Sequence, residues 1–261
     1  MLRAERQAVI PDIHTTPAGW GIRPVLFSVG GQAVTSYGVF VLLGLLAAVA
    51  LYFYNTRGRN LGSNGLYVAS AALVGGIIGA KLPIWIAYAP QIISNPNATA
   101  LLSGRTIVGG IIGGVIAVYF TKKRLGITAK LGNYLVPSLC VGIFFGRIGC
   151  YLTGCCYGRA SGFGWGVDFG DHVSRHPTQL YEALFVLGLF IYAQATMERY
   201  APGELFKRFI IVYFAWRFLA EFIRVNPVWA FGLTYYQVAA AIVILLYVWR
   251  IFAGNRERTI A

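Results

Sequence analysis

Arginines within apolar stretches are the residues of this chain whose type and spacing best suit chemistry. Arg147 stands in the segment FFGRIGC, and Arg217 and Arg224 flank Glu221 in the segment WRFLAEFIR. The spacings of four and three residues place Arg217, Glu221 and Arg224 on one face of a helix. A guanidinium group is planar, stays charged and donates two parallel hydrogen bonds, so it is suited to binding a phosphodiester.

These charges are costly in an apolar setting. A charged side chain at the centre of a membrane-spanning helix costs about 2.5–3.5 kcal/mol on insertion scales. A structural ion pair with Glu221 is one explanation, but that helix face carries two cations and one anion, and Arg147 adds another positive charge. We therefore expect a membrane-buried, outward-facing site that binds an anion, with a phospholipid headgroup as its ligand.

A second polar segment surrounds the sequence HPTQLYE at residues 176–182. Pro177 suits the first turn of a helix, and Gln179 and Glu182 are then three residues apart on one helix face, with His176 one turn earlier. The pattern predicts a polar cluster at the outer membrane surface. Helix capping, together with anchoring of Tyr181 at the interface, explains it equally well.

Cysteines gather just before this segment. The chain has four of them, Cys140, Cys150, Cys155 and Cys156. Adjacent cysteines seldom share a tetrahedral metal site and the C-x-x-C spacing is missing, so we expect neither a bound metal nor a cofactor. A redox pair such as Cys150 with Cys155 is one alternative, and packing of small polarisable side chains in a tight turn is the other.

Composition identifies the setting of these residues. The chain of 261 residues is 57% hydrophobic and 12% charged, with a mean hydropathy of +0.63, whereas a soluble domain carries about 25% charged residues. These values exclude a disordered chain, a fibrous protein and an ordinary soluble enzyme. The net charge of +13 indicates contact with anionic lipid headgroups rather than nucleic acid, because most cations lie between the apolar runs.

The apolar runs predict an all-α, polytopic integral membrane protein with about seven transmembrane helices. The expected spans cover residues 34–54, 66–88, 106–120, 134–152, 177–197, 205–223 and 234–252. The segments that follow the odd-numbered spans carry twelve lysines and arginines, against seven on the opposite side. The positive-inside rule therefore predicts an external N-terminus and a cytoplasmic C-terminus.

The predicted organisation has one membrane domain, over residues 34–253. Residues 1–33 are expected to form an external or interfacial segment, since they lack the continuous apolar core of a cleavable signal peptide. Residues 153–176 are expected to form an external loop, and residues 254–261 a cytoplasmic tail.

One short sequence repeat occurs in the second and third predicted spans. The segment VGGIIG stands at residues 74–79 and again at residues 108–113. Glycines four residues apart allow two helices to pack closely in lipid. They also allow a lipid headgroup to approach the backbone, and the two interpretations are compatible.

Several of these motifs together resemble the prolipoprotein diacylglyceryl transferase family. They are GRIGCYLTGCCYG at residues 146–158, HPTQLYE at 176–182 and RFLAEFIR at 217–224, supported by TSYG at 35–38 and the glycine pair at 109–110. The resemblance covers roughly residues 34–250. It implies an enzyme of the bacterial inner membrane that moves a diacylglyceryl group from phosphatidylglycerol to the lipobox cysteine thiol of a preprolipoprotein and releases glycerol phosphate.

The resemblance also implies roles for individual residues. Arg147 and Arg217 would hold and neutralise the departing phosphate, Glu221 would orient Arg217, and Arg224 would lie at the rim. Positive charge placed where negative charge develops lowers the barrier of such a transfer. The other expected contacts to substrate are Tyr37, Gly109, Gly110, Cys150, Cys155, Gly158, His176, Gln179, Tyr181, Glu182 and Arg224.

The chain departs from the family pattern at several positions. Val108 replaces a histidine, Cys150 an asparagine, Cys155 a glutamate and Lys81 an arginine. Three explanations of how the acceptor is activated stay open: His176 as the base, activation of the thiol by the arginines alone, or a paralogue with another acceptor. A membrane thiol oxidoreductase and an anion transporter are the alternatives from other functional classes.

Overall fold

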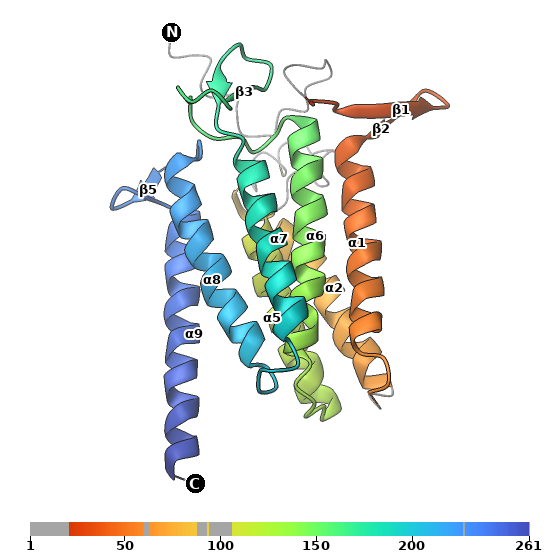
Figure 1. Cartoon of the computed structure of the whole chain (residues 1–261), viewed down its shortest axis with the longest axis vertical. Coiled ribbons are helices and arrows are strands. Elements are labelled where there is room, and N and C mark those ends of the chain that lie inside the picture. Colours follow the sequence, from red (N-terminus) through yellow and green to blue (C-terminus); the bar gives the residue numbers. More distant parts are fainter. Residues whose placement is uncertain (1–20, 60–62, 88–92, 94–105, 227, 261) are drawn as a thin grey trace. The chain divides into compact units, whose positions relative to one another are not determined.

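The computed structural model describes residues 21–59, 63–87, 93, 106–226 and 228–260, and most of them are helical (Figure 1). The chain divides into two compact units. The first unit comprises Met1–Pro11 and Thr56–Leu131, and the second comprises Asp12–Asn55 and Gly132–Ala261. Residues 1–20, the greater part of the predicted N-terminal external segment, lie outside the described residues.

In the first unit, helix α2 (Ser63–Ala87) packs against helix α5 (Ile107–Leu125). The two VGGIIG repeats form this contact. A Cβ atom added at Gly75 would lie 2.6 Å from the carbonyl oxygen of Gly113, closer than real Cβ atoms approach an oxygen. The packing interpretation of the repeat is therefore confirmed, because side chains at these positions would force the helices apart.

The second unit is built around α6. Its helices are α1 (Ser36–Asn55), α6 (Gly132–Thr153), α7 (Thr178–Thr196), α8 (Glu204–Ala220) with the 3₁₀ turn η1 (Glu221–Ile223), and α9 (Tyr235–Ile260). Helix α6 contacts α1, α7 and α8, and α8 also contacts α9. Figure 1 shows these helices running side by side. Half of the most apolar stretch of α6 is buried, against 17% in α1, so α6 is the central helix of this unit.

Four of the described helices, α1, α2, α6 and α9, are long and apolar enough to cross a membrane. The surfaces of α1, α2 and α9 carry exposed leucines, including Leu46 on α1 and Leu245 on α9. Such surfaces are stable in lipid but not in water. The prediction of a helical membrane protein is confirmed at this level. Helices α5, α7 and α8 coincide with the remaining predicted spans, and α9 continues to Ile260, beyond its predicted end.

Short hairpins, which the apolar runs did not predict, lie beside one end of the helices of the second unit (Figure 1). They pair β1 (Val25–Val29) with β2 (Gln32–Thr35), β3 (Val167–Asp168) with β4 (Ser174–Arg175), and β5 (Val228–Ala230) with β6 (Leu233–Thr234). A small core of Ile22, Tyr151 and Phe169 joins the loop after α6 to the start of this unit. The loop is thereby fixed above the ends of α6 and α7.

Candidate functional site

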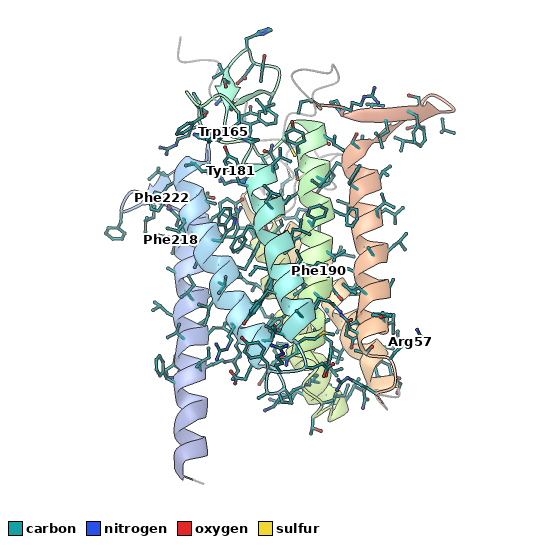
Figure 2. All side chains as sticks on the ribbon, viewed as in Figure 1. Arg57, Trp165, Tyr181, Phe190, Phe218 and Phe222 are labelled. Atoms are coloured by element: carbon teal, nitrogen blue, oxygen red, sulfur yellow. The ribbon has the colours of Figure 1, made fainter. Side chains whose placement is uncertain are left out.

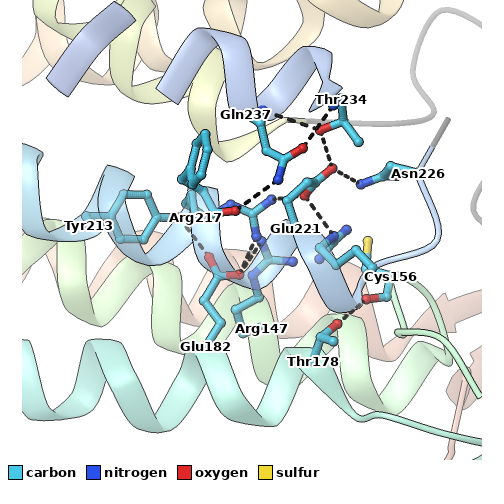
Figure 3. A network of polar contacts seen from close by, with 12 residues as sticks. Arg147, Cys156, Thr178, Glu182, Tyr213, Arg217, Glu221, Asn226, Thr234 and Gln237 are labelled. Atoms are coloured by element: carbon cyan, nitrogen blue, oxygen red, sulfur yellow. Dashed lines mark hydrogen bonds and ion pairs between the residues drawn. The ribbon is translucent and has the colours of Figure 1, made fainter. Parts of the chain in front are cut away.

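Three helices of the second unit bring charged side chains together. Arg147 comes from α6, Glu182 from the second turn of α7 and Arg217 from the last turn of α8 (Figure 3). Nη2 of Arg147 and Nη1 of Arg217 each lie 2.8 Å from the same atom, Oε2 of Glu182. All three side chains are at most 6% exposed. One carboxylate therefore holds two guanidinium groups from different helices beside each other.

The second oxygen of Glu182 is bound as well. The hydroxyl of Tyr213, a fully buried residue, donates a hydrogen bond of 2.7 Å to Oε1. Tyr213 lies one turn before Arg217 on α8, so both contact the carboxylate from the same helix face. Sequence reasoning missed Tyr213, although its spacing of four residues from Arg217 was an available signal.

Glu182, which we expected in a polar cluster at the outer membrane surface, is 1% exposed and lies at the centre of the charged cluster. The expected partner of Arg217 also differs, because Glu221 lies 3.6 Å from Nη2 of Arg217 and Glu182 is closer. The reason is that α7 packs beside α6, which places the second turn of α7 between the two arginines.

Glu221 instead connects the cluster to the segment before α9. Its Oε2 lies 3.6 Å from both Arg217 and Arg224, and its Oε1 accepts hydrogen bonds from Asn226 and from the hydroxyl of Thr234. The side chain of Arg224, which we expected at the rim of the site, is 10% exposed and contacts Glu221. Asn226 and Thr234 are functional candidates that sequence reasoning missed, since nothing local links them to Glu221.

The cluster has more positive than negative charge. Three arginines, Arg147, Arg217 and Arg224, face two glutamates. Nε of each arginine and Nη1 of Arg224 are buried without a hydrogen-bond partner among the described residues. Buried charged donors are normally satisfied, so unmatched ones need an explanation. An anionic ligand would supply both the missing charge and the missing acceptors.

The cysteine-rich turn lies next to this cluster. Thr178 donates a hydrogen bond of 2.7 Å from its hydroxyl to the carbonyl oxygen of Cys156, and the Gln179 amide donates to that of Cys155. The four cysteines are free thiols. Hydrogen bonds from the Cys150 and Cys155 thiols, and then the charges of Arg224 and Arg147, hold the pKa of Cys156 well below its usual value.

The same hydrogen bonds have the opposite effect on the pKa of the neighbouring thiol, Cys155. The pKa of Cys155 is raised well above its usual value, because its proton is shared with Cys150 and Cys156 and because it is buried. Figure 3 shows Cys156 beside the arginine and glutamate side chains.

His176 does not share a helix face with Gln179 and Glu182, because α7 begins only at Thr178. Its Nδ1 lies 3.2 Å from the hydroxyl of Tyr181, which also accepts a hydrogen bond of 3.0 Å from the Trp165 indole. Figure 2 shows Trp165 and Tyr181 near one another at the end of α7. The imidazole thus belongs to an aromatic group in the loop before α7, whereas Gln179 is fully buried and supports the cysteine turn.

The glycines among the expected site residues serve packing. A Cβ atom at Gly158 would lie 2.6 Å from the carbonyl oxygen of Ile223, where the loop crosses the end of α8. Tyr37 lies on the first turn of α1, and a Cβ atom at Gly149 of α6 would be 3.3 Å from its Cα atom. Gly109 and Gly110 belong to the first unit, and their part in substrate binding stays a prediction.

Comparison with known proteins gives consistent similarities. Residues 24–253 match the family described as prolipoprotein diacylglyceryl transferase. A phosphatidylglycerol–prolipoprotein diacylglyceryl transferase of Clostridium tetani is 35% identical over 216 residues, which are 79% of this chain and 87% of that protein. Proteins of the same name from Dehalococcoides mccartyi (35% over 239 residues, 86% and 91%) and Geobacter sulfurreducens (34% over 221 residues, 78% and 82%) are similarly related.

Proposed function

The chain belongs to the prolipoprotein diacylglyceryl transferase family, and from this premise we propose how its charged cluster works. The protein is a membrane transferase that moves a diacylglyceryl group from phosphatidylglycerol to the lipobox cysteine thiol of a preprolipoprotein. The thiol sulfur attacks the glyceryl carbon that bears the phosphate. A carbon–sulfur bond forms, the carbon–oxygen bond breaks, glycerol phosphate leaves with the electron pair, and the thiol proton passes to water.

The observation that carries this proposal is the pair of guanidinium groups on one carboxylate oxygen, with further buried donors unmatched. Arg147 and Arg217 would receive the phosphodiester and stabilise the charge that develops on the leaving phosphate. In a site protected from water, such preorganised donors contribute several kcal/mol to lowering the barrier. Both arginines are positioned before substrate arrives, so little reorganisation is needed.

Glu182 would act as a positioning residue. Two guanidinium groups repel one another, and the carboxylate between them offsets that repulsion in the absence of lipid. Because Glu221 offsets only part of the remaining charge, the cluster keeps an excess positive charge for the phosphate. Tyr213 fixes the rotamer of Glu182 by its hydrogen bond.

We further propose that the protein lies in the inner membrane with an external N-terminus, so that the site opens outward. The excess of lysine and arginine after the odd-numbered spans supports this orientation. The exposed side chains of Phe163 and Trp165 in the loop before α7 also fit an interfacial position.

A reconstituted reaction tests the proposal. The protein in nanodiscs containing headgroup-labelled phosphatidylglycerol is given a lipobox peptide, and both glycerol phosphate release and the mass of the peptide are measured. We expect equal amounts of glycerol phosphate and of diacylglyceryl peptide. Arg147→Lys, which keeps the charge but loses the paired donors, should reduce both by at least about 10²-fold, whereas Arg208→Lys at the other end of α8 should not. Release of glycerol phosphate without peptide modification would instead identify a transferase with another acceptor.

A further inference from the structure

Three sulfur atoms converge beside the charged cluster. The Sγ atoms of Cys150, Cys155 and Cys156 all lie within 4.8 Å of one another. Cys150 is on the last turn of α6, and the other two follow in the turn after it. Nothing in the proposed function uses this group of thiols.

The backbone holds these sulfurs in place. The amide of Cys155 donates a hydrogen bond of 3.1 Å to the carbonyl oxygen of Cys150, and α7 binds the carbonyl oxygens of Cys155 and Cys156 through Gln179 and Thr178. Cys156 has a φ angle of 65°, in the left-handed region that residues other than glycine seldom adopt. This conformation brings two adjacent cysteine side chains to the same side, which an extended chain would not.

The arrangement is close to that of a metal site. Zinc binds thiolate sulfur at about 2.3 Å in tetrahedral geometry, which separates neighbouring sulfurs by about 3.8 Å. Sulfurs already within 4.8 Å of each other would need to close by no more than about 1 Å.

We propose that Cys150, Cys155 and Cys156 bind one Zn²⁺ ion and that its fourth position takes the thiol of the acceptor cysteine. This proposal departs from our expectation from sequence that the adjacent cysteines bind no metal. Three protein ligands with one open position are typical of catalytic rather than structural zinc. The inference rests on the proposed function, because a thiol is the acceptor in that reaction.

Zinc would solve the problem of activating the acceptor thiol. A thiol that coordinates zinc loses its proton, which passes to water. The bound thiolate sulfur then attacks the glyceryl carbon of phosphatidylglycerol, the carbon–oxygen bond breaks, and the phosphate leaves with the electron pair toward Arg147 and Arg217. The product is a neutral thioether, a weaker ligand than a thiolate, so it leaves the zinc, which is unchanged.

The described histidines do not offer a simpler base. The imidazole of His176 contacts Tyr181, and that of His172, which is 97% exposed, contacts Asp168. Neither makes a contact with the arginine cluster among the interactions of the described residues. A metal ion bound by the three cysteines would activate the acceptor thiol without a base from the loop before α7.

The test begins with metal content. The full-length protein is purified under reducing conditions in nanodiscs, exposed to Zn²⁺ and washed, and zinc per chain is measured. We expect one zinc ion, which is lost in Cys150→Ser, Cys155→Ser and Cys156→Ser but kept in Cys140→Ser. Cys140 is a buried cysteine of the same helix outside the group, so it controls for the substitution itself, and size-exclusion profiles control for folding. Replacement by Co²⁺ should give thiolate-to-metal charge-transfer absorption in the same proteins.

X-ray absorption at the zinc edge then tests the open position. We expect three sulfur neighbours at about 2.3 Å and a fourth when a lipobox peptide is added, but not when its cysteine is replaced by serine. Removing zinc with a chelator should reduce transfer by at least about 10²-fold, the contribution of activating a nucleophile, and Zn²⁺ should restore it.

The outcomes separate the two proposals. Full transfer by the metal-free protein, a disulfide within the group in the active protein, or zinc that gains no sulfur from the peptide would overturn the inference and leave the transferase function standing. Zinc bound by the three cysteines without any transfer from phosphatidylglycerol would instead refute the proposed function and keep the metal site.

Discussion

Replacing Glu182 by glutamine removes the one charge that holds two arginines together. Each guanidinium–carboxylate contact spans 2.8 Å, which corresponds to about 6 kcal/mol at an effective dielectric constant of about 20. Desolvation offsets much of this, and removing one partner of a buried ion pair costs about 3–5 kcal/mol in practice. We therefore expect Glu182→Gln to lower the free energy of unfolding by about 3–5 kcal/mol in the absence of phosphatidylglycerol.

Phosphatidylglycerol should compensate for the missing carboxylate. The phosphate restores the lost negative charge, so it should bind the variant at least about tenfold more tightly than the original protein, a difference of about 1.4 kcal/mol. Catalysis should change in the opposite direction, because the arginines lose their common anchor. The variant should therefore show a lower KM for phosphatidylglycerol together with a lower kcat.

The assay is thermal unfolding in nanodiscs of phosphatidylethanolamine, with and without phosphatidylglycerol, followed by transfer kinetics. Glu204→Gln is the matched control, since it breaks the partly exposed pair of Glu204 with Lys207 at the start of α8 and should cost at most about 1 kcal/mol. Unchanged stability of Glu182→Gln, or weaker binding of phosphatidylglycerol by it, would refute the assigned role of the carboxylate.

Further substitutions test the surroundings of the site by thermal unfolding. Tyr213→Phe removes one hydrogen bond to a buried carboxylate and should cost about 1.5–3 kcal/mol, with a fall in kcat; an unchanged kcat would mean that the hydroxyl does not position Glu182. Gly158→Ala should cost about 1–3 kcal/mol by overpacking, whereas Gly162→Ala, with nothing within 4 Å of the added methyl group, should be nearly neutral. In the first unit, Gly75→Ala should destabilise the packing of α2 on α5 far more than Gly76→Ala, whose nearest neighbour is 3.6 Å away; equal effects would contradict the close glycine contact.

The helices were predictable because a membrane imposes long apolar runs. The predicted span at 134–152 corresponds to α6, Gly132–Thr153, and the predicted span at 66–88 corresponds to α2, Ser63–Ala87. The hairpins were not predicted, since strands of two to five residues carry too little periodicity to be recognised. The glycine repeat predicted a close helix contact because only glycine permits that approach.

The charged residues of the site could be predicted from the sequence, but the ion pairs between them could not. Arg147 and Arg217 stand out as cations in apolar runs, and the structure brings both to one carboxylate. Local spacing pointed to Glu221 as the partner of Arg217, because four residues within one helix can be read from sequence. The actual close partner, Glu182, comes from another helix, and such a long-range contact depends on how α6, α7 and α8 pack.

The spacing of the cysteines in the sequence was likewise an incomplete guide to their arrangement. Their spacing argues against a shared site for adjacent residues, and that argument assumes an ordinary backbone. That assumption does not hold here, because Cys156 has a left-handed backbone conformation and α7 donates hydrogen bonds to the turn. The hydrogen bonds from α7 are tertiary contacts, which the local spacing of the cysteines does not predict.

A structure of the protein with phosphatidylglycerol bound tests the central claim most directly. The account predicts phosphate oxygens about 2.7–2.9 Å from the guanidinium nitrogens of both Arg147 and Arg217. A phosphate bound elsewhere, with both arginines still held by Glu182, would contradict it.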